Sequence, residues 1–381
     1  MPRGRDGRKI SADAVVVGAG PAGLGAALGL ARKGMDVAVL DMQDRIGSRR
    51  RGETIHFDRE MDALLGKGFF ERQTIRTIRK RSYFSHTGLM RVDRTIKNPN
   101  CIISWPDFIR SMADVVKAAG ARIIPASTVV GFLEEKGRIT GVRAMVGGFM
   151  QEEIRAGMVF SCGGCEDPAS LFLNIDRTGM DMPVSKRLVR GYAGPDERFE
   201  YHLHIQGDTL TVGTIFPRTH GEAEFILLSY AKGRKPQAMT FEEFAGAHNL
   251  FRERLEGCEP FYTLKTAIPM GKMVFPCCPR DGLVMAGDAL GHVQARGGSG
   301  IKTSFLMGYA AGTLGAEALT AGKWTSATRQ MLEQAMRNSP HTRRLRMHNL
   351  IYSTLRAGIF GRIRSPREMD RLWPVLSVAL R

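Results

Sequence analysis

Three closely spaced glycines near the start of the chain have the residue type and spacing that suit phosphate binding. They lie in a turn that reads Gly18-Ala-Gly20-Pro21-Ala22-Gly23. Gly18 permits a tight turn, Gly20 lets the backbone approach a pyrophosphate, and Gly23 allows close packing of a helix on a strand. Glycines near strand ends also serve ordinary turns, but an apolar run precedes this turn and a helical segment follows it. The pattern therefore predicts a dinucleotide site, with the phosphates at a helix N-terminus.

Asp41 completes this motif, because it follows the apolar residues 37–40 that we expect to form the second strand. A carboxylate at this position accepts hydrogen bonds from a ribose 2′-hydroxyl and disfavours a 2′-phosphate. The expected ligand is therefore FAD or NAD, and this motif leaves both open.

A second glycine motif lies in the last third of the chain. Gly287 and Asp288 end an apolar run, and a glycine-rich turn then leads into a helix over residues 303–318. The Asp288 side chain can accept a hydrogen bond from a ribityl hydroxyl, and N–H groups of the turn can face a flavin. The predicted residues of that turn are Gly298, Gly300 and Ile301. This second motif favours FAD over NAD.

His292 follows this motif and is a candidate catalytic residue beside the isoalloxazine ring. The alternative is that it packs or bonds to the backbone. The sequence contains no recognisable Ser-His-Asp set or paired carboxylates, and this suits a reaction whose difficult step is carried out by a flavin. The catalytic residues are otherwise unassigned.

Composition limits the class of protein. The 381 residues are 43% hydrophobic and 24% charged, which suits two or three globular domains. The N-terminal apolar run is too short for a signal peptide, and no run reaches about 18 apolar residues, so we expect a cytoplasmic protein without a spanning helix. The net charge is +17 without a recognisable nucleic-acid-binding motif. We therefore expect no nucleic acid partner. The positive charge indicates binding either to the anionic inner face of a membrane or to an acidic substrate. The alternative is that it serves solubility alone.

Six cysteines occur in a chain without an export signal, so we expect thiols. Cys162 and Cys165 have C-x-x-C spacing, and the adjacent Cys277 and Cys278 could complete a four-thiolate metal site. A redox disulfide is another alternative. Buried thiols without a metal are the favoured interpretation.

The middle of the chain predicts a substrate-binding sheet. Residues 199–206, 209–216 and 223–230 alternate apolar and polar side chains between turns, and residues 241–255 have helical periodicity. We expect one hydrophobic cavity above the flavin ring, and its predicted lining residues are Phe216, Pro217, Phe225, Ile268 and Pro269. The alternative is that these residues are ordinary core.

The two glycine motifs, separated by this sheet, resemble the FAD-dependent oxidoreductases of the para-hydroxybenzoate hydroxylase type. Within them the chain is most similar to the geranylgeranyl reductase family over most of residues 12–320. The shared features are Arg51-Gly-Glu53, Ile215-Phe-Pro217-Arg218, Ala267-Ile-Pro269, Gly287-Asp288 and Gly300-Ile301. The resemblance implies that Arg51 and Glu53 bind the cofactor FAD. It also implies reduction of carbon–carbon double bonds in a hydrophobic, isoprenoid-like substrate, with NAD(P)H or a reduced carrier protein as the electron donor.

The chain departs from the reductase pattern at several positions. Arg51 stands where the family has a cysteine, Trp105 replaces an arginine, and Ser161-Cys-Gly163-Gly replaces Ala-Asp-Gly. Gly213-Thr214 stands where an aromatic residue is usual. A flavin-dependent monooxygenase or halogenase on the same scaffold, and a non-catalytic flavoprotein, therefore remain as alternatives.

The expected fold is α/β, with a Rossmann-like FAD-binding domain of the para-hydroxybenzoate hydroxylase type, an inserted antiparallel-sheet substrate domain and a helical C-terminus. The expected FAD-binding domain is discontinuous and covers residues 10–85, 101–172 and 270–325. The expected substrate domain covers residues 86–100 and 173–269, and the basic helical segment covers residues 326–381.

Apolar residues recur at helical spacing in the C-terminal segment; they are Leu345, Ile351, Leu355 and Ile359. Arginines greatly outnumber acidic residues there. We expect a basic amphipathic helix pair that packs on the protein, and the alternative is that this pair binds an anionic lipid surface.

Overall fold

The computed structural model describes residues 11–175, 181–207, 209–219, 221–231, 237–269, 276–294, 298–322, 325–360, 367–371 and 373. The chain forms two compact units. Unit 1 comprises Met1–Arg51, Trp105–Asp176 and Gly271–Asn349, and unit 2 comprises Gly52–Ser104, Arg177–Met270 and Leu350–Arg381.

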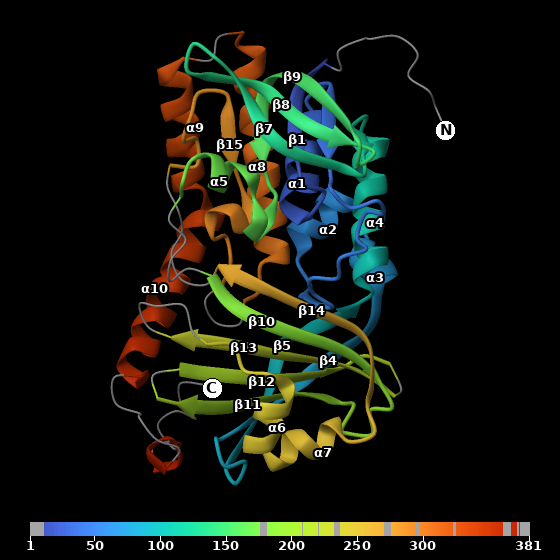
Figure 1. Ribbon diagram of the computed structural model, residues 1–381, viewed down its shortest axis with the longest axis vertical. Helices are drawn as coiled ribbons and strands as arrows, with labels where there is room; N and C mark the ends of the chain where they lie inside the picture. Colours follow the sequence, from blue (N-terminus) through green and yellow to red (C-terminus); the bar gives the residue numbers. More distant parts are fainter. Residues whose placement is uncertain are drawn as a thin grey trace. The chain divides into compact units, whose positions relative to one another are not determined.

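Unit 1 contains a seven-stranded sheet of order β6-β2-β1-β9-β8-β7, with β15 also paired to β9. Five strands run parallel: β1 (Ser11–Val17), β2 (Val37–Leu40), β6 (Arg122–Ile124), β9 (Met150–Ser161) and β15 (Leu283–Met285). The antiparallel strands are β7 (Ser127–Glu135) and β8 (Arg138–Val146). Residues 14–17, 37–40 and 283–285 of the parallel strands are buried apolar runs, as expected where helices cover a parallel sheet (Figure 1).

Two glycine-rich helices cross closely in unit 1. They are α1 (Pro21–Ala31) and α8 (Ile301–Thr320), and both are largely buried. A Cβ added at Gly308 would overlap the Ala22 carbonyl oxygen, and one at Gly29 would lie 2.6 Å from the Tyr309 carbonyl oxygen. The amphipathic helix α4 (Trp105–Ala118) also packs in this unit. The small residues therefore let the α1 and α8 backbones touch.

Unit 2 contains an eight-stranded sheet of order β14-β10-β13-β12-β11-β4-β5-β3. Its strands are β3 (Thr54–His56), β4 (Thr74–Phe84), β5 (Arg91–Ile103), β10 (Asp181–Arg190), β11 (Arg198–Gln206), β12 (Thr209–Pro217), β13 (Glu222–Ala231) and β14 (Glu259–Pro269). Neighbouring strands are antiparallel except β4 and β11, which are parallel.

One face of this sheet is covered by two short helices, α6 (Phe241–Ala247) and α7 (Asn249–Leu255) (Figure 1). Phe244 and Phe251 of these helices pack with the sheet residues Ile215 and Phe225 in one buried cluster. This cluster is the apolar core of unit 2 on the helical face.

The first boundary of the sheet unit differs from the prediction. In the first third of the chain, we expected only residues 86–100 to belong to the sheet domain. In the structure, all of residues 52–104 belong to unit 2. Basic and apolar residues alternate after residue 61, where α2 (Arg59–Leu65) and α3 (Phe69–Gln73) are short and β4 follows directly. β4 pairs with β5 in a hairpin and also with β11, more than 100 residues later, and a local pattern cannot reveal this second pairing.

The C-terminal segment is helical, as predicted. It begins with α9 (Ser326–Asn338) and α10 (Pro340–Phe360). Leu345 is buried, in agreement with the packing interpretation, while the side chains of residues 351–360 lie outside the described residues. Further along, Met369 and Trp373 pack with Tyr83 in unit 2.

The Rossmann-like α/β unit, the largely antiparallel sheet unit and the helical C-terminus confirm the predicted fold class. No helix in the described part of the chain is long and apolar enough to cross a membrane.

Candidate cofactor site

The first glycine turn has the geometry that its sequence predicts. Gly18 has φ of +94°, and a Cβ there would lie 2.7 Å from the carbonyl oxygen of Cys162 on the neighbouring chain segment. A Cβ on Gly23 would overlap the carbonyl oxygen of Gly18. Both positions therefore require glycine, the first for backbone conformation and both for close packing.

Gly20 is different because a Cβ added there would meet nothing within 4 Å, and its φ of −79° is accessible to any residue. It is the N-cap of α1, with Pro21 in the first turn, and among the described residues no side chain caps this helix and no acidic residue lies in its first turn. The N–H groups at this helix start are thus open to an anion. The open space above Gly20 fits a pyrophosphate.

Asp41 lies just beyond β2 and is 5% exposed. Its Oδ2 atom accepts a hydrogen bond from the Ala19 backbone N–H at 2.6 Å, and its Oδ1 atom accepts one from the Gln43 N–H at 2.9 Å. The carboxylate thereby ties the glycine turn to the end of the second strand. Oδ1 also accepts from the Gln43 side-chain amide at 3.2 Å, so the remaining lone pair of Oδ2 can accept from a ribose hydroxyl.

The second glycine motif lies against the first. Gly287 opens the short 3₁₀ helix η2 (Gly287–Leu290), and a Cβ added to it would lie 2.6 Å from the Cβ of Ala22. Asp288 accepts a hydrogen bond from the Ser304 hydroxyl at 3.3 Å, and its Oδ1 lies 3.2 Å from the Cβ position of Gly300. The fold therefore brings Asp288 and the start of α8 to the N-terminus of α1.

The N-terminus of α8 repeats the arrangement at α1. Its N-cap is Gly300 and its first residue is Ile301, and the part of the chain that the structure describes provides no side-chain cap and no acid in the first turn. Gly298 has a positive φ of +67° in the preceding turn. Two uncapped helix starts thus lie in unit 1, each led by a glycine.

His292 bonds to the backbone of this motif. It is 1% exposed, and its Nδ1 accepts a hydrogen bond from the Gly287 N–H at 3.0 Å. Burial lowers the pKa of His292 to about 4, so the ring is neutral at pH 7 with its hydrogen on Nε2. These contacts favour the backbone-bonding alternative over a catalytic role.

Asn349 of α10 forms a hydrogen bond with Val293, the residue that follows His292. Its side-chain amide donates to the Val293 carbonyl at 3.0 Å in a buried position. The C-terminal helix therefore supports the second glycine motif, a contact that the sequence pattern does not reveal.

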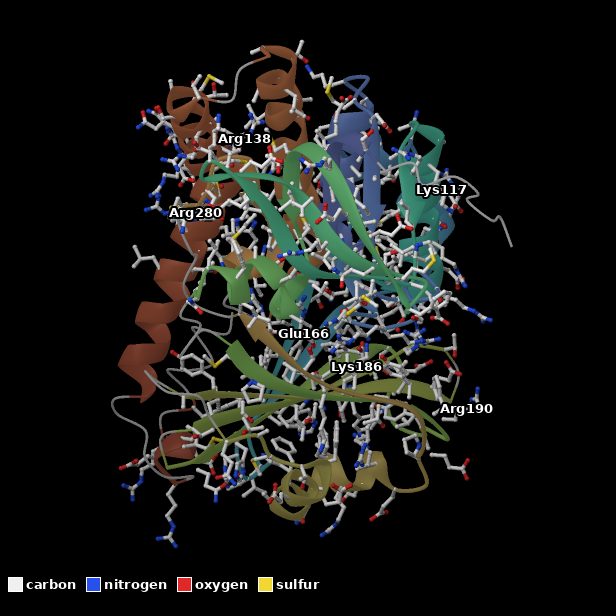
Figure 2. All side chains as sticks on the ribbon, turned by 45° about the horizontal axis from the view of Figure 1, so that its top comes forward. Lys117, Arg138, Glu166, Lys186, Arg190 and Arg280 are labelled. Atoms are coloured by element: carbon white, nitrogen blue, oxygen red, sulfur yellow. The ribbon has the colours of Figure 1, made fainter. Side chains whose placement is uncertain are left out.

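The loop that contains Arg49, Arg50 and Arg51 forms an ion pair with Glu166 in unit 1. Arg49 donates two hydrogen bonds to Glu166, at 2.6 and 2.7 Å, while the nearest Arg51 nitrogen lies 4.0 Å from the same carboxylate. Glu166 belongs to η1 (Gly164–Glu166) and is labelled in Figure 2. The hydrogen bonds from Arg49 lower the pKa of Glu166. Arg51 thus lies beside an acidic partner.

Glu53 does not have the exposure that a cofactor ligand needs. It is fully buried in unit 2, where it accepts from Arg218 at 2.6 Å. Arg218 also donates to the Ile103 carbonyl at 3.1 Å. The predicted cofactor role of Glu53 is therefore replaced by a structural ion pair, which joins the Arg51-Gly-Glu53 segment to the Phe-Pro-Arg segment.

A second buried ion pair shares this electrostatic environment. The Nζ of Lys186 on β10 lies 2.5 Å from Glu224 on β13, and both side chains are at most 2% exposed (Lys186 is labelled in Figure 2). Burial raises the pKa of Glu224, and the nearby charge of Glu53 adds to that effect, while Lys186 and Arg218 oppose it. Two acids and two bases thus neutralise one another inside unit 2.

Asp167 organises the loop after β9, where Ser161-Cys-Gly163-Gly stands in place of the Ala-Asp-Gly of the reductase family. Its carboxylate accepts from the Ser161 hydroxyl at 2.9 Å, the Gly163 N–H at 2.7 Å and the Ala169 N–H at 3.0 Å. Asp167 is the N-cap of α5 (Pro168–Phe172). The sequence motifs above did not predict a role for Asp167, although an Asp followed by Pro is a helix-start signal that could have identified it.

The cysteines do not form the four-thiolate set. All six are free thiols, and the cysteine group that comes together among the described residues is Cys277 and Cys278 with Glu333. Burial raises the pKa of Cys162, which keeps it protonated at neutral pH. Cys162 instead packs beside the first glycine turn through its backbone.

The predicted substrate residues divide between the two faces of the unit 2 sheet. Phe216 pairs with Glu224, while Phe225 pairs with Ile215, so the two phenylalanines point to opposite faces. Phe225 is fully buried against α6 and α7 and is a core residue, which corrects its assignment to a substrate cavity. Phe216 is half-buried on the other face.

Ile268 and Pro269 are consecutive on β14 and also point to opposite faces. Ile268 pairs with Met182, which lies on the Phe216 face by strand alternation, and it is half-buried. Pro217 and Pro269 are buried on the other face. Two of the five predicted residues, Phe216 and Ile268, therefore share the face of the sheet opposite to α6 and α7.

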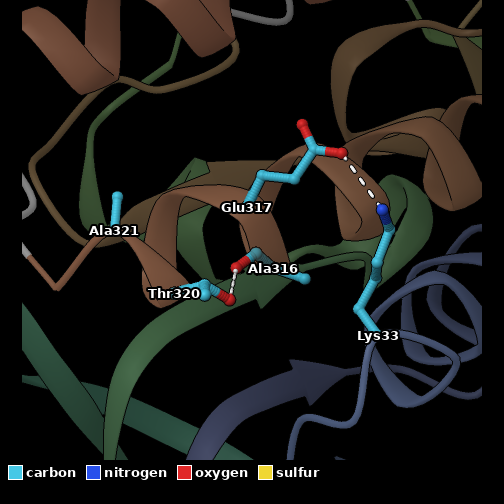
Figure 3. Close-up of a pocket in the computed structure, with 5 residues that line it drawn as sticks. All are labelled: Lys33, Ala316, Glu317, Thr320 and Ala321. Carbon is cyan, nitrogen blue, oxygen red and sulfur yellow. Dashed lines mark hydrogen bonds and ion pairs between the residues drawn. The ribbon is translucent and has the colours of Figure 1, made fainter.

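A surface hollow in unit 1 lies at the wrong end of the helices to hold the cofactor. It is lined by Lys33, Ala316, Glu317, Thr320 and Ala321 (Figure 3). These residues follow α1 or lie at the C-terminal end of α8, whereas the glycine motifs lie at the N-terminal ends. Lys33 and Glu317 form a half-exposed ion pair of 3.3 Å across it.

Comparisons with known proteins agree with this geometry. The family model of the FAD binding domain matches residues 11–330. A digeranylgeranylglycerophospholipid reductase of Methanosarcina mazei is 24% identical over 325 residues, which cover 81% of this chain and 76% of that protein.

Two solved structures share the fold. A geranylgeranyl bacteriochlorophyll reductase-like protein from Thermoplasma acidophilum has a TM-score of 0.81 at 18% identity and covers 97% of this chain and 92% of its own. A myxobacterial chondrochloren halogenase has a TM-score of 0.67 at 14% identity, with 91% and 82% coverage. The chain belongs to the FAD binding domain family, and it is an FAD-dependent oxidoreductase of geranylgeranyl reductase-like type.

Proposed function

We propose that this oxidoreductase reduces carbon–carbon double bonds of a hydrophobic, isoprenoid-like substrate. The proposal rests on one structural observation, a group of half-buried apolar side chains, called here the apolar face, on the side of the unit 2 sheet that also carries the buried Lys186–Glu224 ion pair. The names of the related reductases support the same substrate class.

The apolar face spans several strands. Register places Phe216, Ile226, Leu264 and Ile268 on the same side of the sheet, and all four are half-buried. Phe216 packs on Phe199 with ring centroids 4.4 Å apart. Large apolar side chains that keep part of their surface accessible provide the broad contact that an extended hydrocarbon requires.

The glycine motifs of unit 1 provide the cofactor site in this proposal. The open backbone at Gly20 and the start of α1 hold the pyrophosphate, Asp41 accepts from the adenosine ribose, and Asp288 accepts from the ribityl chain. Bound FAD supplies the hydride-transfer chemistry that no side chain can provide. Arg51 binds on the phosphate side of the site, beside Glu166.

The proposal is tested with reduced protein under anaerobic conditions. We expect dithionite-reduced protein, mixed with a geranylgeranyl-bearing lipid, to yield product that has gained two hydrogens for each double bond reduced, measured by mass spectrometry. Unchanged lipid in this test, together with oxygen consumption and a hydroxylated or halogenated product when the reduced protein is mixed with an aromatic substrate in air, would instead establish the monooxygenase or halogenase alternative.

A matched pair of variants tests the apolar face. Phe216→Ser should lower kcat/KM for the lipid by roughly tenfold or more, since it removes a large apolar contact surface. Phe149→Ser, which removes an equally large ring that is 79% exposed in the turn between β8 and β9, should leave kcat/KM unchanged. Equal effects of the two changes would remove Phe216 from the substrate site.

The electron donor and the source of the substrate belong to the same proposal. We propose NAD(P)H or a reduced carrier protein as the donor, and an anionic membrane surface as the source of the lipid. The net charge of +17 and the exposed Met347 and Leu350 on the basic helix α10 suit such a surface. Co-sedimentation with anionic vesicles that weakens as salt rises would support it, and equal binding to neutral vesicles would not.

A further inference from the structure

Three histidines from separate segments meet in unit 2. His86 lies in the turn between β4 and β5, His204 is on β11, and His248 immediately precedes α7. Each offers a ring nitrogen, and these nitrogens lie within 4.8 Å of one another. The His86 and His204 rings stack with centroids 4.4 Å apart, and the His248 centroid lies 5.7 Å from that of His86.

Two of these imidazoles have a buried nitrogen without a partner. His204 is 7% exposed and His248 is 1% exposed. The Nε2 of His248 lies 3.0 Å from the Leu203 carbonyl oxygen, which can only accept, so Nε2 carries the hydrogen and Nδ1 keeps its lone pair. Neither this Nδ1 nor the Nδ1 of His204 has a hydrogen-bond partner among the described residues. Buried polar atoms in this state require a ligand or a water.

We propose that His86, His204 and His248 bind one divalent transition-metal ion of the zinc class, with a fourth position left for water. Three imidazole nitrogens and an open position are an established donor set for such ions. The contact of His248 with the Leu203 carbonyl is also typical of a metal-bound histidine, which donates its other N–H to a backbone carbonyl or carboxylate.

His86 completes the set at a small cost. Its Nδ1 accepts a long hydrogen bond, 3.3 Å, from the Ile205 N–H, and metal binding exchanges this contact for a coordination bond. Asp370 is close enough for its charge to act on His86, and its carboxylate accepts from Thr87 at 2.8 Å. A negative charge beside the cluster favours a cation over a neutral ligand. The site would link the β4–β5 turn, β11 and the start of α7.

The test uses the full chain with its flavin, freed of metal by a chelator and titrated with Zn²⁺ and with Co²⁺. We expect one equivalent to bind with the visible absorption of tetrahedral cobalt and without a thiolate charge-transfer band. His204→Gln and His248→Gln should each weaken binding by roughly 100-fold or more, since a lost ligand costs at least as much as a lost partner of a ligand. His341→Gln on α10 is the matched control, and it should bind as the wild type does.

Two further variants keep the test decisive. His86→Asn changes a half-buried turn residue and should fold even if the buried variants do not, and it should weaken binding comparably. A Cys277→Ser, Cys278→Ser double variant removes the other candidate group, next to Glu333, and should bind unchanged. No binding by the wild type, binding lost in the cysteine variant, or binding unaffected by all three histidine changes would each overturn the site and leave water as the occupant of the cluster.

Discussion

At the scale of single residues, the buried pair of Glu53 and Arg218 connects two short motifs of the sequence. The Nη1 atom of Arg218 lies 2.6 Å from the Oε2 atom of Glu53. Glu53 is fully buried and the Arg218 side chain is 6% exposed. Water cannot solvate either charge when its partner is lost, so each depends on the other. The pair therefore contributes to the stability of unit 2 in a way that an exposed pair does not.

We predict that Arg218→Met lowers the free energy of unfolding by about 3–5 kcal/mol, because it removes the arginine partner of a fully buried carboxylate. Adding Glu53→Leu to that variant should recover most of the loss. Chemical denaturation measures the free energy of unfolding of the single and the double variant. Lys33→Ala, which breaks the half-exposed pair with Glu317, is the control and should cost less than about 1 kcal/mol. A loss as small in Arg218→Met as in Lys33→Ala would contradict the account of this pair.

His292 predicts a dependence of stability on pH. Burial lowers its pKa from 6.5 to about 4, so the folded state resists protonation that the unfolded state accepts. The contribution of the neutral, buried His292 ring to the free energy of unfolding is therefore fully present above pH 6.5. This contribution is lost as the pH falls from 6.5 towards 4, and the total loss is about 3 kcal/mol. Asparagine in its place can still accept from the Gly287 N–H without titrating.

The measurement compares denaturation midpoints of wild type and His292→Asn from pH 7.5 to 4 by steps of roughly half a unit. The variant should lose less stability over this range, with the two curves parallel above pH 6.5. His341→Asn should follow the wild type throughout. Parallel curves across the whole range would show that His292 does not carry this effect.

At the scale of elements, the crossing of α1 and α8 sets the position of both glycine motifs. The two backbones touch because four positions at the crossing have no side chain: Gly25, Gly29, Gly308 and Gly312. The starts of α1 and α8 are thereby held with Ala22 against Gly287. Cofactor binding should therefore depend on glycines that do not contact the cofactor.

We predict that Gly308→Ala lowers the free energy of unfolding by about 1–3 kcal/mol, because its Cβ would overlap the Ala22 carbonyl and push the helices apart. It should also reduce the flavin content of the purified protein. Gly246→Ala on α6, where a Cβ meets nothing within 4 Å, should instead be neutral or stabilising. Full flavin content and unchanged stability in Gly308→Ala would show that the close crossing is not required.

The elements that could be predicted from sequence are those with local signals. The turn at Gly18, the acid at Asp41 and the turn at Gly287 each need residue types that the chain displays within a few positions, so their motifs predict them directly. The pairing of Glu53 with Arg218 spans 165 positions and has no local signal.

The two faces of the unit 2 sheet illustrate the same limit. Phe216 and Phe225 lie on adjacent strands, and their faces depend on the register that the connecting turn imposes. The register pairs Phe216 with Glu224, so Phe225 falls on the helical face. Strand alternation predicts two faces for each strand, but it does not predict which face of one strand matches which face of the next.

At the scale of the whole molecule, two glycine motifs that are far apart in the sequence lie together in unit 1, while one face of the unit 2 sheet carries half-buried apolar side chains. The central claim is that the open space at Gly20 belongs to the FAD pyrophosphate. Gly20 and Gly246 are well matched for its test, because a Cβ at either meets nothing within 4 Å and neither has a positive φ.

The direct measurement is the FAD content and apparent affinity of Gly20→Val and Gly246→Val, with the apoprotein fold checked by circular dichroism. Both variants should fold, because a Cβ at either position meets no atom of the protein within 4 Å. Gly246→Val should bind one FAD per chain as the wild type does, whereas Gly20→Val should lose at least roughly 100-fold in affinity, since its side chain occupies the space of the phosphates. A folded Gly20→Val protein that retains FAD at full stoichiometry and wild-type affinity would contradict the account.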